Sequence, residues 1–218
     1  MKRLLELFCG ENKSVSKWGE SNGYEVVTLD WNPKCHPTIC ENLLTWDYRV
    51  YPPGHFTICW ASPDCTHFSI ARTTGPPRNL EGANALVQRT LEIFQYFQPK
   101  VFCLETPATG LLPKQPYMSA YGYVICDYCM FSGDGAERLG PETFWYRKRT
   151  QIYTNKTDVL LKPNVLCDKK CPGILANTKH PGCHAVGFGG RLARCMVSNI
   201  AVNHKHRIPQ KLVEYLLS

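Results

Sequence analysis

Residues 4–30, LLELFCGENKSVSKWGESNGYEVVTLD, contain the pattern that decides the fold. They open with a short apolar run typical of a β-strand, and this run ends at Gly10. The polar segment from about residue 14 to residue 22 is typical of a helix. Residues 24–29 form a second β-rich run that closes on Asp30. A strand, a helix and a second strand in this order predict a βαβ unit, the building block of a parallel sheet.

The same alternation continues along the chain. Apolar runs that end in turn-forming residues predict more strands, and apolar positions at helical spacing predict a long helix. We expect strands at 56–60, 101–104, 123–130 and 150–154, a helix between 82 and 98, and a final helix that begins at Pro209. The sequence therefore predicts an α/β fold with a mostly parallel sheet, followed by a Cys-, Gly- and Lys-rich insert over about 160–195.

The charge of the 218 residues is +7 and is unevenly distributed. Residues 1–140 have a net charge of −2, whereas residues 141–218 have a net charge of +9. A basic final third on a nearly neutral body favours a polyanionic partner, of which nucleic acid is the commonest. A solvated lysine-rich surface is the alternative.

Twelve cysteines would suit a disulfide-rich secreted protein, but the chain is not short and begins with no signal peptide. No stretch of 18 apolar residues is present, so we expect no membrane span. We therefore expect an intracellular protein, not a secreted one, whose cysteines are thiols, metal ligands or nucleophiles.

The residues that follow each predicted strand are candidates for a binding site, because ligands of open α/β sheets bind at the carboxyl ends of the strands. Asp30 follows Gly10 by 20 positions, a spacing used to bind ribose hydroxyls. Cys65 lies in a loop just after a predicted strand, where a thiolate could attack an electrophilic carbon. Glu105 follows another strand and could be a general acid in the same cleft. A buried apolar cysteine and a surface or capping carboxylate are the alternatives.

These residues resemble the motifs of the cytosine-5 DNA methyltransferases, in particular the compact forms of phages and large viruses. The matches follow the family's linear order and extend from Leu4 to the C-terminal helix. They are Leu5-Glu6-Leu7-Phe8-Cys9-Gly10, Asp30-Trp31, Thr45-Trp46-Asp47, Pro63-Asp64-Cys65-Thr66-His67-Phe68-Ser69, Glu105-Thr106-Pro107, Lys148-Arg149-Thr150-Gln151 and Ile208-Pro209.

The resemblance implies a Rossmann-like methyltransferase fold that uses S-adenosylmethionine. It implies three catalytic residues: Cys65 as the nucleophile, Glu105 as the acid at ring N3, and Arg149 as the cation at the O2 edge of cytosine. The residues implied to bind the cofactor are Phe8, Gly10, Asp30, Trp31, Asp47 and Pro63.

The chain departs from the family pattern at several positions. Asp64 and Thr66 replace the second proline and the glutamine of the nucleophile loop, and Thr106 replaces asparagine after the glutamate. Gln151 replaces the second arginine of the family's arginine-containing strand, and the glycines that follow Gly10 in the family motif are missing. These changes bear on cofactor affinity and rate, but the three catalytic residues are intact.

The implied reaction is methylation of C5 of a cytosine flipped out of DNA, through a covalent bond from Cys65 to C6. We expect the DNA to be held by basic residues in 147–211, and the protein to be a monomer. Methylation of tRNA or free deoxycytidylate is an alternative, and so is a nucleic-acid-binding relative that has lost catalysis.

The resemblance divides the chain into a catalytic core at 1–156, a reduced target-recognition insert at 157–198 and a C-terminal helix at 199–218 that completes the core. Because the insert is short, we expect short or relaxed sequence specificity. The insert also contains four candidate zinc ligands at close spacing, which could form a structural zinc site. They are Cys167, Cys171, His180 and Cys183, with His184 adjacent. Unlinked thiols in a loop are the alternative. Cys126 and Cys129 lie on a predicted strand, where core packing is expected.

Overall fold

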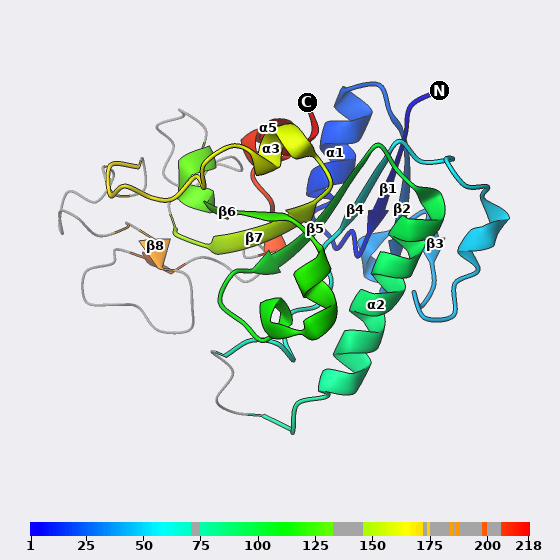
Figure 1. The fold of residues 1–218 in the computed structure, drawn as a ribbon, viewed down its shortest axis with the longest axis horizontal. Coiled ribbons are helices and arrows are strands. Elements are labelled where there is room, and N and C mark those ends of the chain that lie inside the picture. The colour runs from blue at the N-terminus through cyan, green and yellow to red at the C-terminus, as the bar shows by residue number, and fades with distance from the viewer. Residues whose placement is uncertain are drawn as a thin grey trace.

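A seven-stranded sheet between layers of helices forms the body of the protein (Figure 1). The computed structural model describes residues 1–70, 75–132, 146–171, 174, 184, 186–187, 198–199 and 206–218. The sheet order is β3-β2-β1-β4-β5-β7-β6. Its strands are β1 Arg3–Leu7, β2 Glu25–Asp30, β3 Ile39–Cys40, β4 Ile58–Ala61, β5 Val101–Pro107, β6 Tyr123–Asp127 and β7 Arg149–Thr154.

The first five strands in this order are parallel, and only the pairs that involve β7 are antiparallel. The expected α/β fold with a mostly parallel sheet is therefore confirmed. Because the parallel strands run in one direction, their carboxyl ends meet at one edge of the sheet. In the described part of the insert, a small parallel pair is formed by β8 Val186–Gly187 and β9 Ser198–Asn199.

The described helices are α1 Ser14–Ser21, α2 Leu80–Phe97, α3 Thr157–Leu160 and α5 Gln210–Leu217, with short 3₁₀ helices η1 Pro33–Cys35, η2 Tyr48–Val50, η3 Leu112–Lys114, η4 Pro116–Ala120 and η5 Tyr128–Phe131. The three predicted helices correspond to α1, α2 and α5, whereas α3 and the 3₁₀ helices were not predicted. The strand expected at 123–130 is shorter than predicted, because the chain turns into η5 after Asp127.

The central strands are buried on both faces, which explains their continuous apolar sequence. Leu4 and Leu5 are both fully buried, although neighbouring residues of a strand point to opposite faces. Leu4 belongs to a core that includes residues of α1 and α5, whereas Leu5 belongs to a core that includes residues of α2. Helices therefore cover each face of the sheet.

The two ends of the described chain meet in the first of these cores. The backbone N–H of Ile208 donates to Ser14 Oγ at 3.1 Å, and Gln210 Nε2 donates to the Ser14 carbonyl at 2.6 Å. Val159 of α3 is buried in the same core, so the packed body continues past residue 156, where we expected the insert to begin. No helix among the described residues combines the length and apolar character needed to cross a bilayer.

The turn between β1 and α1 has an unusual backbone. Phe8 has a φ of 59° and Gly10 a φ of 57°. The left-handed region is ordinary for glycine, but it is costly for Phe8, and such strain is concentrated at functional sites. Gly19 allows α1 to approach the sheet, since a Cβ there would lie 3.0 Å from Val26 Cγ2. The turn itself is held at the carboxyl end of β2 by the Phe8 backbone N–H, which donates to the Leu29 carbonyl at 2.8 Å.

Glu6, in the middle of β1, ties the strand to α1. Its carboxylate accepts the Ser16 backbone N–H at 2.8 Å and also the Ser16 hydroxyl. Burial raises the pKa of Glu6 from 4.5 to about 7, and the hydrogen bonds from Ser16 oppose the shift. The folded protein therefore binds this proton more tightly than the unfolded chain does.

Replacing Glu6 by Gln should remove this pH dependence. The contribution of Glu6 to stability is fully present below pH 4.5 and is lost as the pH rises to about 7. The free energy of unfolding of the wild type, relative to Glu6→Gln, should fall by roughly 3 kcal/mol across this range. Urea unfolding of both proteins on either side of the window measures the difference, and a constant difference would contradict the assignment.

Candidate active site

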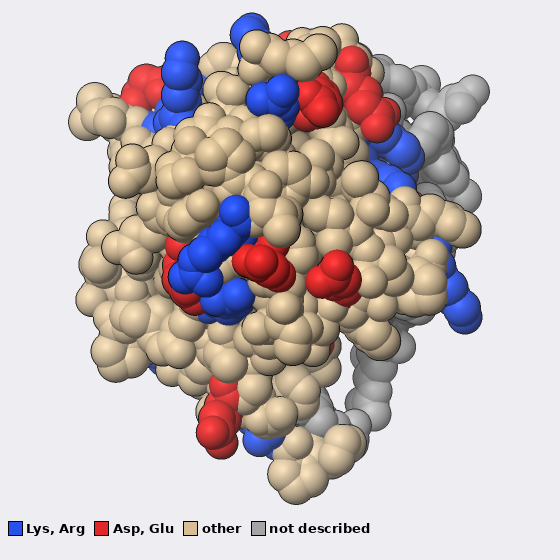
Figure 2. All heavy atoms as spheres, turned by 90° about the vertical axis from the view of Figure 1, so that its right-hand side faces the viewer, with Lys and Arg blue, Asp and Glu red and all other residues tan. Residues whose placement is uncertain are grey.

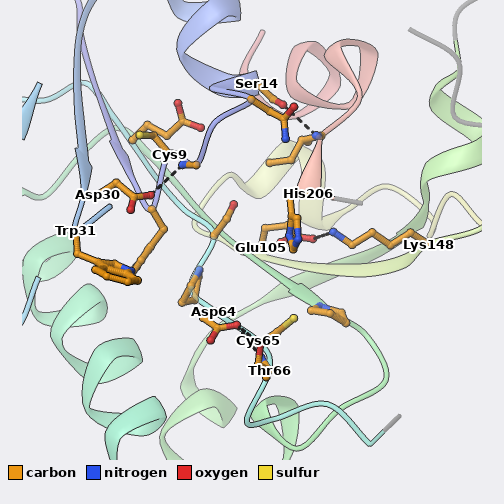
Figure 3. A pocket seen from close by; sticks show the side chains of 18 residues that line it. Cys9, Ser14, Asp30, Trp31, Asp64, Cys65, Thr66, Glu105, Lys148 and His206 are labelled. Atoms are coloured by element: carbon orange, nitrogen blue, oxygen red, sulfur yellow. Dashed lines mark hydrogen bonds and ion pairs between the residues drawn. The ribbon is translucent and has the colours of Figure 1, made fainter. Parts of the chain in front are cut away.

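A cavity of about 300 Å³ lies at the carboxyl ends of β1, β2, β4 and β5 (Figure 3). Asp30 and Trp31 lie on one side of it and Glu105 and Lys148 on the other, with Cys65 in the loop below them. The residues that line the cavity are Glu6, Phe8, Cys9, Gly10, Asn12, Ser14, Asp30, Trp31, Ser62, Pro63, Asp64, Cys65, Thr66, Glu105, Pro107, Lys148, His206 and Ile208.

Asp30, at the end of β2, fixes the turn that follows β1. Its carboxylate accepts the Gly10 backbone N–H at 3.0 Å through one oxygen and the Asn32 N–H at 2.9 Å through the other. Each carboxylate oxygen has a further lone pair for a ligand hydroxyl. Trp31, the next residue, is 73% exposed, so a large part of its indole surface is available for contact. Asp30 and Trp31 thus offer a hydroxyl acceptor and an aromatic surface side by side.

A second cavity, of about 360 Å³, adjoins the first. The two share Phe8, Trp31 and Asp64. The second cavity is also lined by apolar side chains, among them Leu43 and Leu86. The shared residues join the two cavities around Trp31, and together they have the volume and mixed apolar and polar lining of a small-molecule site.

Asp47 lies outside both cavities, contrary to the expectation that it contacts the adenine amino group. Its carboxylate instead accepts the Arg49 backbone N–H at 3.1 Å and caps η2. The polar residues from this part of the chain that do line the second cavity are Glu41 and Asn42, directly after β3. We could not predict this because β3 has only two residues and gives little sequence signal.

Cys65 is half-buried in the loop after β4, as predicted. In the same loop, Asp64 Oδ1 accepts the backbone N–H of Thr66 at 2.9 Å and its hydroxyl at 2.5 Å. Burial, together with the negative charge of Glu105, raises the pKa of Cys65 to about 11, and Lys148 acts in the opposite direction. The thiol is therefore protonated at neutral pH, and its ionisation depends on the charges of the two residues across the cavity.

Glu105 is almost fully buried at the carboxyl end of β5, with 6% exposure. Its Oε1 accepts the Tyr128 hydroxyl at 3.0 Å and the Lys148 ammonium at 3.0 Å. Burial raises the pKa of Tyr128 well above its usual value, so the phenol remains a donor. The two donors fix the carboxyl group in the same cavity as Cys65.

Arg149 does not line this cavity, contrary to the expected position at the cytosine O2 edge. Its Nε and Nη2 donate to the two oxygens of Asp127 at 3.0 and 2.9 Å. Although burial opposes the charge, these bonds and the Cys167 N–H hold the pKa of Asp127 below its usual value. Among the described Lys and Arg residues, the one that lines the cavity is Lys148, the residue before Arg149. Neighbouring residues along an extended chain point in opposite directions, so Arg149 points away.

A second group of reactive side chains lies apart from the cavity. The ligand atoms of Cys129, Cys167, Cys171 and His184 all lie within 4.8 Å of one another. Cys167 and Cys171 were predicted as part of this cluster, whereas Cys129 was predicted to be a core residue. His180 and Cys183, the other two predicted ligands, lie outside the described residues.

Several residues of the cavity carried no clear signal in the sequence. Glu6, Ser14 and His206 line it together with Lys148. Lys148 lay within a quoted motif, but the sequence did not predict that its side chain points into the cavity. Glu6 also lay within a quoted motif, but the sequence did not predict that it lines the cavity.

Among curated proteins, the chain is similar to one described as "Probable DNA (cytosine-5)-methyltransferase" from Frog virus 3 (isolate Goorha). The two are 28% identical over 231 aligned residues, which cover 99% of this chain and 98% of the relative. The aligned region thus spans nearly the whole chain. No family model matches the chain.

Among solved structures, the fold is similar to a prophage-encoded protein of E. coli assigned as a DNA modification methyltransferase. The TM-score is 0.50 at 11% identity, and the match covers 71% of this chain and 46% of that protein. This chain therefore spans less than half the length of that structure, and the likeness concerns the fold alone. The methyltransferase fold predicted from the motifs is confirmed. Over nearly its whole length, the chain is similar to a viral protein described as a probable DNA (cytosine-5)-methyltransferase.

Proposed function

We propose that the protein transfers a methyl group from S-adenosylmethionine to C5 of cytosine in DNA, through a covalent bond between Cys65 and C6. The observation that carries the proposal is that Cys65 and Glu105 line one cavity together with Asp30 and Trp31. A nucleophile, a carboxyl group and a nucleoside-binding edge within one cavity are what a cytosine methyltransferase requires.

The cavity residues fit the cofactor. Asp30 has lone pairs for the two ribose hydroxyls, and Trp31 offers an exposed ring against which adenine can stack. The apolar second cavity, with Leu43 and the adjacent Asn42, would receive the base. When bound, S-adenosylmethionine supplies an electrophilic methyl group on a positively charged sulfur.

Cys65 would act first, because C5 of cytosine is a poor nucleophile until a thiolate adds to C6. The Cys65 thiol would give its proton to water, and the new bond from Cys65 Sγ to C6 moves an electron pair towards C5 and ring N3. A proton taken from water and shared between Glu105 and N3 neutralises the charge there. Methyl transfer to C5 would release neutral S-adenosylhomocysteine. The C5 proton then passes to water, its bonding pair re-forms the C5–C6 double bond, and the C6–S bond breaks to return the Cys65 thiolate.

The charges across the cavity explain how Cys65 is activated. The negative charge of Glu105 raises the pKa of Cys65, whereas Lys148 lowers it. When Glu105 shares a proton with N3 of a bound cytosine, its charge is neutralised and Lys148 is left facing the thiol. Binding of the base would therefore lower the pKa of Cys65 at the step that needs a thiolate.

We place the DNA contact on the side of residues 147–211. Figure 2 shows that the face on the right of Figure 1 is mostly uncharged and that several of its Lys and Arg side chains lie close to Asp and Glu. Ion pairs of Arg89 and Arg49 with Glu92 show the same mixing of charge. In contrast, Arg147, Lys169 and Lys170 are exposed in the basic final third. Phosphate contacts there would offset the free-energy cost of flipping the cytosine.

The insert at 157–198 is short for a target-recognition region, so we propose short or relaxed sequence specificity. Few side chains are available to read base edges, and each base contact adds only about 1–3 kcal/mol of discrimination. This can be tested by measuring which sequences are methylated in a library of random DNA duplexes. Methylation confined to one long recognition sequence would contradict the proposal.

Incubation with labelled S-adenosylmethionine tests the reaction directly. Duplex DNA should accept the label, and Cys65→Ser should reduce transfer by more than about 10³-fold because the nucleophile is lost. Cys40→Ser, which changes an exposed cysteine outside both cavities, is the matched control. Label found only in tRNA or deoxycytidylate would change the substrate, and label retained by Cys65→Ser would exclude the mechanism.

Alkylation of Cys65 by iodoacetamide tests the electrostatics of the cavity. In the wild type the rate should increase about tenfold per pH unit up to about pH 11, because only the thiolate reacts. Glu105→Gln should lower the pKa of Cys65 and accelerate alkylation at pH 8, whereas Lys148→Met should raise the pKa and slow it. Peptide mass spectrometry follows Cys65 with the exposed Cys40 as internal standard. Equal rates in the three proteins would contradict the proposed coupling.

Trp31→Ala should weaken the binding of S-adenosylhomocysteine by about tenfold, since loss of one base–aromatic stack typically costs about 1–3 kcal/mol. Leu161→Ala is the control, because Leu161 is 82% exposed and lines neither cavity. Isothermal titration calorimetry measures both. If Trp31→Ala binds S-adenosylhomocysteine as tightly as the control does, the adenine does not stack on Trp31.

A further inference from the structure

Four soft ligands from separate segments meet beside the β6 edge of the sheet. Cys129 lies in η5, Cys167 and Cys171 follow the segment that pairs with β6, and His184 comes from further along the insert. Their ligand atoms lie within 4.8 Å of one another. Cys129 is 55 positions from His184 in the sequence, so the fold rather than local spacing gathers them.

The distances within the group match the edges of a tetrahedral site. Cys167 Sγ lies 3.5 Å from Cys171 Sγ and 3.6 Å from His184 Nε2, and Cys171 Sγ lies 3.3 Å from that nitrogen. A tetrahedral zinc ion requires edges of about 3.8 Å between sulfurs and about 3.6 Å between sulfur and nitrogen. A disulfide instead requires about 2.05 Å between sulfurs. The observed spacing therefore suits one ion at the centre of the group.

The surroundings indicate a structural role. Among the described residues, Cys129 and Cys171 are buried and form, with Ile174, a cluster that the two main cores do not include. Metal ligation commonly stabilises small clusters of this kind. The Cys167 backbone N–H also donates to Asp127 Oδ2 at 2.9 Å, which orients the loop that carries the ligands.

We propose that Cys129, Cys167, Cys171 and His184 bind one Zn²⁺ ion in a closed tetrahedral site that fastens the insert to the β6 edge of the sheet. Three thiolates and one imidazole are a common set for structural zinc. Because all four positions are filled by the protein, the ion has no open position for substrate or water. The assignment replaces His180 and Cys183 of the sequence-based set with Cys129 and His184.

Metal analysis of the full-length protein, purified with zinc and without chelator under reducing conditions, tests the site. About one zinc per chain is expected in the wild type. Cys129→Ser and His184→Ala should each lower the zinc content at least about tenfold after dialysis, because both remove a ligand. Cys183→Ser and Cys40→Ser are the matched controls and should retain the metal. Zinc that depends on Cys183 but not on His184 would overturn the assignment.

The wild type alone provides a second test in case a variant does not fold. A chelator should remove the zinc, expose the thiols of Cys129, Cys167 and Cys171 to a thiol reagent, and lower the Tm, and added zinc should reverse all three changes. Substitution by cobalt should give the strong visible absorption of a tetrahedral thiolate site. A wild-type protein that contains no zinc and whose thiol reactivity is unaffected by chelator would refute the proposal. So would a disulfide between Cys167 and Cys171 in metal-free protein.

Discussion

The antiparallel insertion of β7 between β5 and β6 is the constraint on which the site depends. Neighbouring residues at the start of β7 point in opposite directions, so Lys148 meets Glu105 while Arg149 meets Asp127. The first pair places a cation beside the carboxyl group in the cavity. The second holds Asp127, which in turn accepts the backbone N–H of Cys167. A shift of one residue in this register would exchange the two cations and disrupt both arrangements.

Much of the fold, and the position of most candidate site residues at one cavity, could be predicted because parallel strands place their carboxyl ends at one edge. Asp30, Trp31, Cys65 and Glu105 each follow a strand that the sequence identifies, and all four line one cavity. Whether Lys148 or Arg149 points into the cavity could not be predicted, because this depends on the strand register. That register is set by pairing with residues more than 40 positions away.

The same reasoning explains the cysteine cluster. A strand over 123–130 would point Cys126 and Cys129 to opposite faces, and this led us to expect core packing for both. The strand ends at Asp127, and the 3₁₀ turn that follows moves Cys129 into the cluster while Cys126 stays in the main core. Tyr128, between them, donates to Glu105. The proposed metal site and the carboxyl group of Glu105 therefore share η5 as a support.

The contact of Ile208 and Gln210 with Ser14 has a consequence for how the protein is made. The core around Leu4 and Val15 is completed by residues of α5, nearly 200 positions later. During synthesis, β1 and α1 leave the ribosome long before their packing partners exist. One face of the early βαβ unit therefore stays uncovered until α5 has been translated. Slow emergence of this helix would prolong the exposure of apolar surface.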